Sequence, residues 1–207
     1  MSEAIQDYLA AVEAAQRSLD LGAIGAAATV IANARDHEAT VFICGNGGSA
    51  ATATHFATDL QKSTRARGQR AVRAVALTDN VSLLTAWAND TQYSRVFAEP
   101  LATLARPGDV LVAISASGNS PNVLEAVAAA ERCGVTVVSL TGFDGGALRS
   151  RAAVAVHVPV ASYEIAEDVH LMVCHIITSL LKAGWPDVPA TDSAGNVDEA
   201  RFSGAPV

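Results

Sequence analysis

The chain has 207 residues, of which 50% are hydrophobic and 17% are charged, so it is long enough for one well-buried domain. A formal net charge of −7 argues against a nucleic-acid-binding surface, which depends on clustered lysines and arginines. No apolar run approaches the roughly 18 residues of a membrane helix, and charged residues interrupt the N-terminal segment, unlike a signal peptide. Three widely spaced cysteines without CxxC spacing predict buried, reduced thiols and a cytoplasmic protein.

Two amphipathic helices are predicted at the N-terminus, over residues 1–37. Apolar side chains recur at helical spacing from Ile5 to Leu19 and again from Ile24 to Ile31. Residues 38–183 then alternate between apolar strands and helices, which predicts an α/β core that ends in a late helix. We expect strands at residues 40–44, 72–77, 110–115, 135–140 and 154–158, and helices at 49–62, 79–88, 93–105, 121–133 and 165–182.

The predicted strands are nearly continuous apolar runs, as expected when helices bury both faces of a parallel sheet. The predicted fold class is therefore α/β, a three-layer doubly wound sheet in a single domain over residues 1–183. In such sheets ligands bind beyond the carboxyl ends of the strands. Residues 184–207 are rich in Pro, Gly, Asp and Ser and are predicted to form a flexible tail, whose start Trp185 can hold.

Two turns rich in glycine and hydroxyl groups follow apolar strands of this predicted sheet. In Gly-Asn-Gly-Gly-Ser at residues 45–49, the glycines allow close backbone approach, and Ser49 can cap the next helix or donate to an oxyanion. The second turn, Ser-Ala-Ser-Gly-Asn-Ser at residues 115–120, precedes Pro121, which suits the first turn of a helix. Each turn alone fits a plain strand-to-helix connection with a serine cap. Two such turns at strand ends of one sheet favour a site for a phosphorylated small molecule.

Histidine and carboxylate side chains lie on the predicted helices. His55 and Asp59 are four residues apart and share one helical face, as a chelating pair requires. On the late helix, Glu164, Asp168 and His175 share another face. The other histidines, His37, His157 and His170, are interpreted as structural. His170 is expected in the core or at a subunit contact.

At these residues the chain resembles the sugar isomerase (SIS) family, and within it the phosphoheptose isomerases. The similarity covers roughly residues 1–183 and rests on a combination of motifs. These are Cys-Gly-Asn-Gly-Gly-Ser-Ala at 44–50, His-Phe-Ala-Thr-Asp at 55–59, Ala-Asn-Asp at 88–90, Gly-Asp-Val-Leu at 108–111, Ile-Ser-Ala-Ser-Gly-Asn-Ser at 114–120 and Leu-Thr-Gly-Phe-Asp-Gly-Gly at 140–146. The resemblance implies a five-stranded parallel sheet and a homotetramer with active sites at subunit contacts.

The resemblance also implies a reaction and a set of site residues. Phosphoheptose isomerases convert sedoheptulose 7-phosphate to an aldose heptose 7-phosphate, with a zinc site of two His, one Glu and one Gln. Matched by motif, the metal positions are His55, Asp59, Glu167 and His175, and the last three of these are the catalytic candidates. The positions that bind phosphate or sugar match residues of both turns and of two further segments: Asn46, Gly47, Gly48, Ser49, Asn89, Asp90, Ser115, Ala116, Ser117, Ser120 and Glu164.

Three of these positions depart from the family pattern. This chain has Asp59 where the family has Glu, Glu167 where it has Gln, and Ala116 where it has Thr. The carboxylates lower the formal charge around a divalent ion from +1 to 0, which favours cation binding but weakens carbonyl polarisation. Glu167 also lies about 80° around the helix from His175, so Asp168 is a rival for the place beside that histidine.

The function predicted from these residues is aldose–ketose isomerisation through an enediol, with serines anchoring the phosphate and zinc polarising the sugar oxygens. One alternative is an isomerase for another sugar phosphate. The other is a SIS protein that binds a sugar phosphate or a protein without catalysis, as relatives associated with the bacterial replication initiator do. All four metal positions hold residues able to bind a metal, which favours an enzyme.

Overall fold

Five parallel strands form the centre of the structure, a computed structural model whose described residues are 2–65 and 69–185. In sheet order the strands are β2 (Arg73–Ala76), β1 (Thr40–Cys44), β3 (Val110–Ser115), β4 (Thr136–Thr141) and β5 (Val154–His157). This confirms the parallel α/β sheet expected from the sequence. Because β2 and β3 lie on opposite sides of β1, the strand order reverses between β1 and β3, where doubly wound sheets bind ligands.

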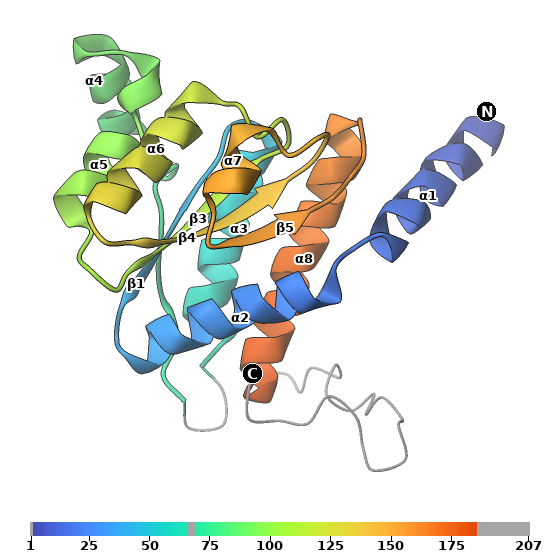
Figure 1. The fold of residues 1–207 in the computed structure, drawn as a ribbon, viewed down its shortest axis with the longest axis horizontal. Coiled ribbons are helices and arrows are strands. Elements are labelled where there is room, and N and C mark those ends of the chain that lie inside the picture. The colour runs from blue at the N-terminus through green and yellow to red at the C-terminus, as the bar shows by residue number, and fades with distance from the viewer. Residues whose placement is uncertain (1, 66–68, 186–207) are drawn as a thin grey trace.

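Helices cover both faces of this sheet (Figure 1). One layer contains α2 (Leu21–Asp36), α3 (Gly48–Lys62) and α8 (Tyr163–Ala183), and the N-terminal α1 (Ser2–Arg17) projects away beside it. The other layer contains α4 (Val81–Asp90), the short 3₁₀ helix η1 (Tyr93–Arg95), α5 (Ala98–Leu104), α6 (Pro121–Arg132) and α7 (Gly146–Arg151). Within residues 2–65 and 69–185, none of the helices combines the length and apolar character that crossing a bilayer requires.

The core has two halves, one on each side of the sheet, because successive strand residues point to opposite faces. In β1, Val41 and Ile43 pack toward α2, α3 and α8, whereas Phe42 and Cys44 pack toward α5 and α6. All six residues of β3 are buried, as expected for a central strand with helices on both sides. The edge strand β2 instead alternates between exposed and buried residues.

Local capping fixes where several helices begin and end. The Asp20 carboxylate accepts from the backbone N–H of Ala23 at 3.1 Å and starts α2. Helix α8 ends at Gly184, whose φ of 93° is the left-handed conformation that favours glycine. The Trp185 indole then donates to Thr29 Oγ1 on α2 at 3.0 Å. The predicted tail lies, from residue 186 onward, outside the described residues.

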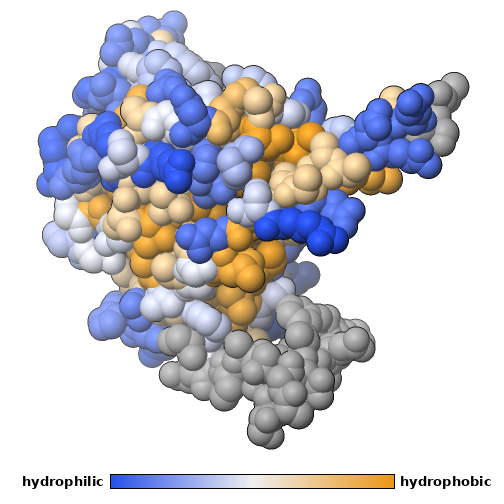
Figure 2. Space-filling model, turned by 45° about the vertical axis from the view of Figure 1, so that its right-hand side comes forward, coloured by the Kyte–Doolittle hydropathy of each residue, from blue (hydrophilic) through white to orange (hydrophobic). Residues whose placement is uncertain are grey.

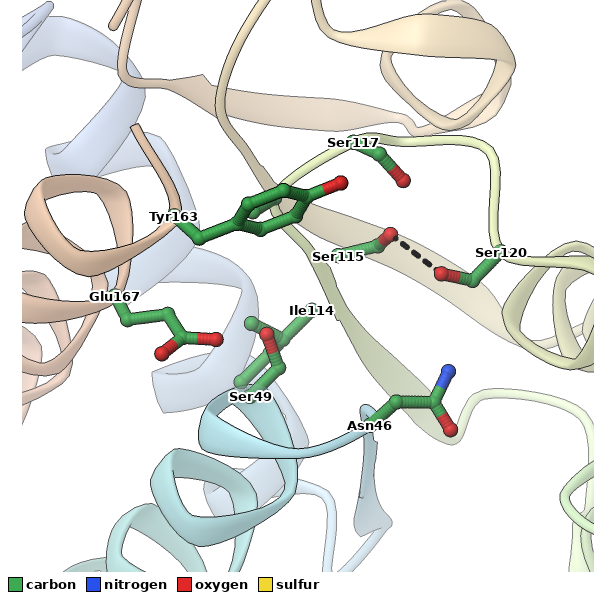
Figure 3. A pocket seen from close by; sticks show the side chains of 9 residues that line it. Asn46, Ser49, Ile114, Ser115, Ser117, Ser120, Tyr163 and Glu167 are labelled. Atoms are coloured by element: carbon green, nitrogen blue, oxygen red, sulfur yellow. Dashed lines mark hydrogen bonds between the residues drawn. The ribbon is translucent and has the colours of Figure 1, made fainter. Parts of the chain in front are cut away.

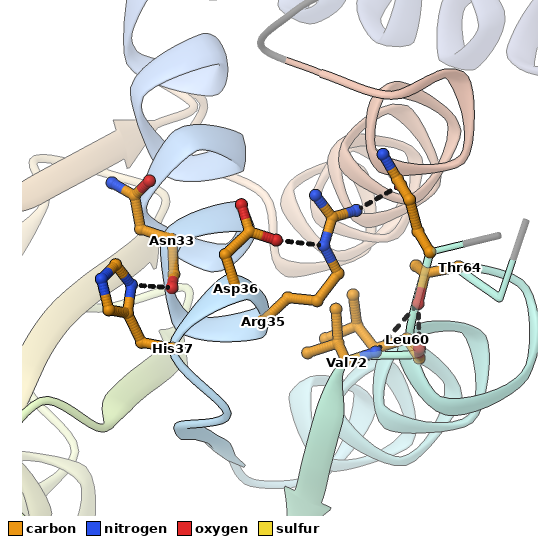
Figure 4. Close-up of polar contacts among 8 residues, drawn as sticks. Asn33, Arg35, Asp36, His37, Leu60, Thr64 and Val72 are labelled. Atoms are coloured by element: carbon orange, nitrogen blue, oxygen red, sulfur yellow. Dashed lines mark hydrogen bonds and ion pairs between the residues drawn. The ribbon is translucent and has the colours of Figure 1, made fainter. Parts of the chain in front are cut away.

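A polar cluster joins the end of α2 to the segment between α3 and β2 (Figure 4). Arg35 is 6% exposed, and its guanidinium donates to Asp36 Oδ1 at 2.9 Å and to Gln69 Oε1 at 2.7 Å. The Thr64 hydroxyl donates to the Leu60 carbonyl and accepts from the backbone N–H of Val72. These contacts tie the turn after α3 to the body of the domain.

The thiols and two helices differ in part from the sequence-based expectations. All three cysteines are free, but only Cys44 and Cys174 are buried, whereas Cys133 is half-buried at the C-cap of α6. Burial raises the pKa of the Cys44 thiol to about 12. The single helix predicted over residues 93–105 is wrong, because η1 and α5 divide it. Helix α7 was not predicted.

Candidate active site

A pocket of about 130 Å³ lies at the carboxyl ends of β1 and β3, where the strand order reverses (Figure 3). None of its nine lining residues carries a positive charge, so an anion there would be held by hydroxyl and amide groups and by the N-termini of α3 and α6. The lining comes from the end of β3, from both predicted turns and from α8: Asn46, Ser49, Ile114, Ser115, Ala116, Ser117, Ser120, Tyr163 and Glu167.

The first turn brings the backbone unusually close to α8. Gly47 is the N-cap of α3 with a φ of 54°, and a Cβ atom added at Gly48 would overlap the Glu167 carboxylate. Ser49 is the second residue of α3 and is 4% exposed. Because Gly47 and not Ser49 occupies the N-cap of α3, the capping role considered for Ser49 is wrong, and its side chain lines the pocket instead.

The second turn also leaves its serines free of capping bonds. Ser120 is the N-cap of α6 but makes no side-chain bond to that helix; its hydroxyl lies 3.1 Å from Ser115 Oγ. Pro121 occupies the first turn of α6, as predicted. Gly118 has a φ of 66°, and a Cβ atom there would overlap the Gly145 carbonyl oxygen, so the turn requires glycine.

Two histidines and one aspartate converge further along the same pair of helices. His55 and Asp59 come from α3 and His175 from α8, and their ligand atoms all lie within 4.8 Å of one another. The two Nε2 atoms are 3.0 Å apart. Asp59 Oδ2 lies 3.4 Å from His55 Nε2 and 3.7 Å from His175 Nε2.

This His–Asp–His group fits the coordination chemistry of zinc. Ligand atoms about 2.1 Å from a tetrahedral zinc ion are separated from one another by about 3.4 Å. The separations of 3.0, 3.4 and 3.7 Å scatter around that value, so the three atoms can form one face of the tetrahedron. Three protein ligands with one open position are typical of catalytic rather than structural zinc.

The two residues considered for the fourth metal position lie outside this group. Glu167 lines the pocket and precedes His175 by eight residues, an axial rise of about 12 Å. Burial, reinforced by Glu164 and Asp168, raises the pKa of the Glu167 carboxyl. The Asp168 carboxylate accepts a 2.7 Å hydrogen bond from the Tyr8 hydroxyl of α1.

Three further predicted site residues, Glu164, Asn89 and Asp90, are exposed. Hydrogen bonds from its own backbone N–H and then from the Ser162 hydroxyl, which donates at 2.8 Å, lower the pKa of the Glu164 carboxyl. Asn89 donates to Asp90 Oδ1 at 2.9 Å at the end of α4. Neither Glu164 nor this pair is among the residues that line the pocket.

Comparison with known proteins decides the family. A SIS-domain family matches residues 3–142. The phosphoheptose isomerase of Chlorobaculum parvum is 41% identical over 166 residues, which cover 79% of each chain. The enzyme of the same name from Aromatoleum aromaticum is 45% identical over 141 residues, covering 66% of this chain and 70% of the relative. The chain belongs to the phosphoheptose isomerase family.

Solved structures of phosphoheptose isomerases share this fold. The structure from Neisseria gonorrhoeae has a TM-score of 0.81 at 34% identity and covers 88% of this chain and 98% of its own. The structure from Francisella tularensis has a TM-score of 0.80 at 28% identity and covers 87% and 95%. The similarity therefore extends over nearly the whole of both phosphoheptose isomerase structures.

The three departures from the phosphoheptose isomerase pattern fall in two places. Asp59 belongs to the His–Asp–His group, whereas Ala116 and Glu167 line the pocket. Ala116 is 4% exposed and presents a methyl group where a threonine would add a hydroxyl.

Two residues at the site were not predicted from the sequence. Tyr163 lines the pocket, and its ring lies 4.8 Å from that of Phe143. Its place directly after the Ser162 cap, beside Glu164, was the available signal. Asn122, one residue after Pro121, bonds to the pocket residue Asn46. No sequence periodicity indicates that contact, because the two residues lie 76 positions apart.

Proposed function

We propose that this phosphoheptose isomerase family member converts sedoheptulose 7-phosphate to an aldose heptose 7-phosphate through an enediol. The observation that carries the proposal is the spacing between the pocket and the His–Asp–His group. Ser49 in the pocket and His55 in the group are six residues apart on α3, an axial rise of about 9 Å. Sedoheptulose 7-phosphate spans a similar distance, about 9 Å over the seven bonds from phosphorus to C2.

In this arrangement the serine pocket anchors the phosphate. Hydroxyls from both turns would donate to its oxygens, aided by the N-termini of α3 and α6. Each hydrogen bond to a charged group contributes about 1.5–3 kcal/mol. Four such hydroxyls can therefore hold and orient the substrate without a lysine or arginine: Ser49, Ser115, Ser117 and Ser120.

The reacting end of the sugar would lie at the His–Asp–His group. Zinc held by His55, Asp59 and His175, with its fourth position open, would supply Lewis acidity toward the sugar oxygens. Isomerisation needs a base that removes a proton from C1 and returns one to C2, while a hydroxyl proton passes from O1 to O2. The candidates at this group are Asp59 and His175, whereas Glu167, the third catalytic candidate from the sequence, lines the phosphate pocket.

We further propose that the active unit is a cytoplasmic homotetramer with active sites at subunit contacts. The pocket of about 130 Å³ is smaller than the roughly 300–1,000 Å³ that enclose a drug-sized ligand, so it encloses the phosphate end alone. Figure 2 shows apolar residues gathered on the surface beside the projecting α1. A second chain that covered this surface could complete the site around the sugar.

Replacing His175 by alanine tests the assignment of the reacting end. Zinc content should fall, and turnover of sedoheptulose 7-phosphate should fall at least about 100-fold, because the variant loses both a ligand and an acid–base group. Phosphate affinity should stay within about twofold, since the pocket is untouched. The matched control is His37→Ala, at an exposed histidine at the end of α2. Unchanged turnover in His175→Ala would remove the role given to His175. If the metal-loaded wild type binds phosphate but turns over no sedoheptulose 7-phosphate, a sugar-phosphate-binding protein without catalysis would be favoured.

A further inference from the structure

The two pocket turns are joined by a pair of asparagine side chains. Asn46 lies in the first turn and lines the pocket, and Asn122 lies in the first turn of α6 with 2% exposure. Asn46 Nδ2 donates to Asn122 Oδ1 at 2.8 Å, and Asn122 Nδ2 donates to Asn46 Oδ1 at 2.8 Å. The pair therefore spans the point of the sheet where the strand order reverses.

The backbone fixes the orientation of both amides. The N–H of Val123 donates to Asn122 Oδ1 at 3.1 Å, and an amide nitrogen could not accept that bond. With Oδ1 of Asn122 held there, its Nδ2 must face Asn46 Oδ1. The Tyr93 hydroxyl donates to the same Asn46 oxygen at 3.1 Å, which reinforces that orientation.

This orientation leaves one N–H of Asn46 for a ligand. The amide nitrogen carries two hydrogens, of which Asn122 accepts one. In Figure 3 the nitrogen of Asn46 lies on the side of Ser120, and the oxygen points away from the serines. Phosphate oxygens can only accept hydrogen bonds, so a flipped amide would replace a donor by a repelling lone pair.

We propose that Asn122 is a positioning residue that holds Asn46 as a hydrogen-bond donor to the substrate phosphate. The inference rests on the proposed function, since it requires that the pocket binds phosphate. It assigns a role in the site to a buried residue that lines no part of the pocket. Tyr93, 58% exposed, supports the same amide from the segment that follows Asp90.

Two substitutions of Asn122 test this role in the full chain. Asn122→Asp keeps the shape but places a second acceptor against Asn46 Oδ1, and Asn122→Leu removes both bonds without adding charge. In variants whose thermal unfolding remains cooperative, the dissociation constant for inorganic phosphate, measured by calorimetry, should rise about tenfold or more. KM for sedoheptulose 7-phosphate should rise in parallel, while kcat changes less than about threefold. Asn33→Asp, at an exposed position of α2, controls for the added charge.

A dissociation constant within twofold of wild type in either folded variant would overturn the proposal. If the Asn122 variants do not fold, Tyr93→Phe removes one exposed donor to the same oxygen and should weaken phosphate binding about two- to fivefold; an unchanged constant would then overturn it. A wild-type chain that binds no phosphate would overturn the proposed function as well. If the wild type binds phosphate and the variants bind it with the same dissociation constant, the positioning role alone would be overturned.

Discussion

His170 is the histidine whose surroundings are most unfavourable to charge. It lies on α8 with 0% exposure, and neither ring nitrogen has a hydrogen-bond partner within residues 2–65 and 69–185. Burial is the main reason that its pKa falls from 6.5 to about 4. This supports a core position for His170.

The lowered pKa predicts an acid sensitivity of folding. Between pH 6.5 and 4 the unfolded chain binds a proton at His170 that the folded chain does not, so stability is lost as the pH falls. From pH 7.5 to 4.5 this histidine should remove about 2–3 kcal/mol from the free energy of unfolding. Urea unfolding of wild type and His170→Phe at both pH values measures it, with the exposed His37→Ala as control. Equal losses in wild type and His170→Phe would contradict the prediction.

Most residues of the site could be predicted from the sequence, but not all of their contacts in space. Four-residue spacing sufficed for His55 and Asp59, because one helix fixes their separation. The contact of either residue with His175 depends on how α3 and α8 pack, which motif matching supplied and periodicity did not. Ser49 shows the opposite limit, since an N-cap sequence pattern cannot say which of two adjacent residues starts a helix.

Helix α1 exposes large apolar side chains that a second chain could cover. It packs against α8 and is held there by the Tyr8–Asp168 hydrogen bond, but Ile5 and Leu9 remain 59% and 62% exposed. Burying such side chains contributes about 1.5–3 kcal/mol each. A second chain on this surface would account for an apolar stripe that solvent otherwise covers.

Light scattering tests this role of α1. We expect the wild type to have a mass near four chains of 21.2 kDa, and the double variant Ile5→Glu with Leu9→Glu to have a smaller one. Gln16→Glu, on an exposed position of the same helix, should leave the mass unchanged. A monomeric wild type would contradict the homotetramer, and an unchanged mass in the double variant would contradict the place of α1 in it.

At the scale of elements, the errors have local causes. Helix α7 has six residues, begins directly after Gly145 and buries only Leu148. Its sequence therefore shows neither a strong helix propensity nor a helical repeat of apolar residues. The division between η1 and α5 could have been predicted from Pro100, which lacks an N–H and is tolerated in the first turn of a helix. The strands were easier, because burial on both faces of β3 produces an uninterrupted apolar run.

In the whole molecule, the fold places the serine pocket and the His–Asp–His group close to each other. The reversal of strand order between β1 and β3 places both turns at one pocket, and the packing of α3 on α8 places the His–Asp–His group beyond it. The apolar runs predicted the sheet, but the order of its strands came only from the structure. The separation between the pocket and the His–Asp–His group follows from α3 alone, which carries both Ser49 and His55, but the convergence of His175 on that group requires the packing of α8.

The most direct test of this account is kcat/KM for ketose phosphates of five to eight carbons, measured with zinc-loaded protein. The rise of about 9 Å along α3 predicts a maximum at seven carbons. Each missing carbon shortens the span by about 1.3 Å, and a displacement of about 1 Å can cost about 100-fold. A five-carbon substrate should therefore be turned over at least about 100-fold less efficiently. Turnover of none of the four substrates, or a maximum at five carbons, would contradict the account.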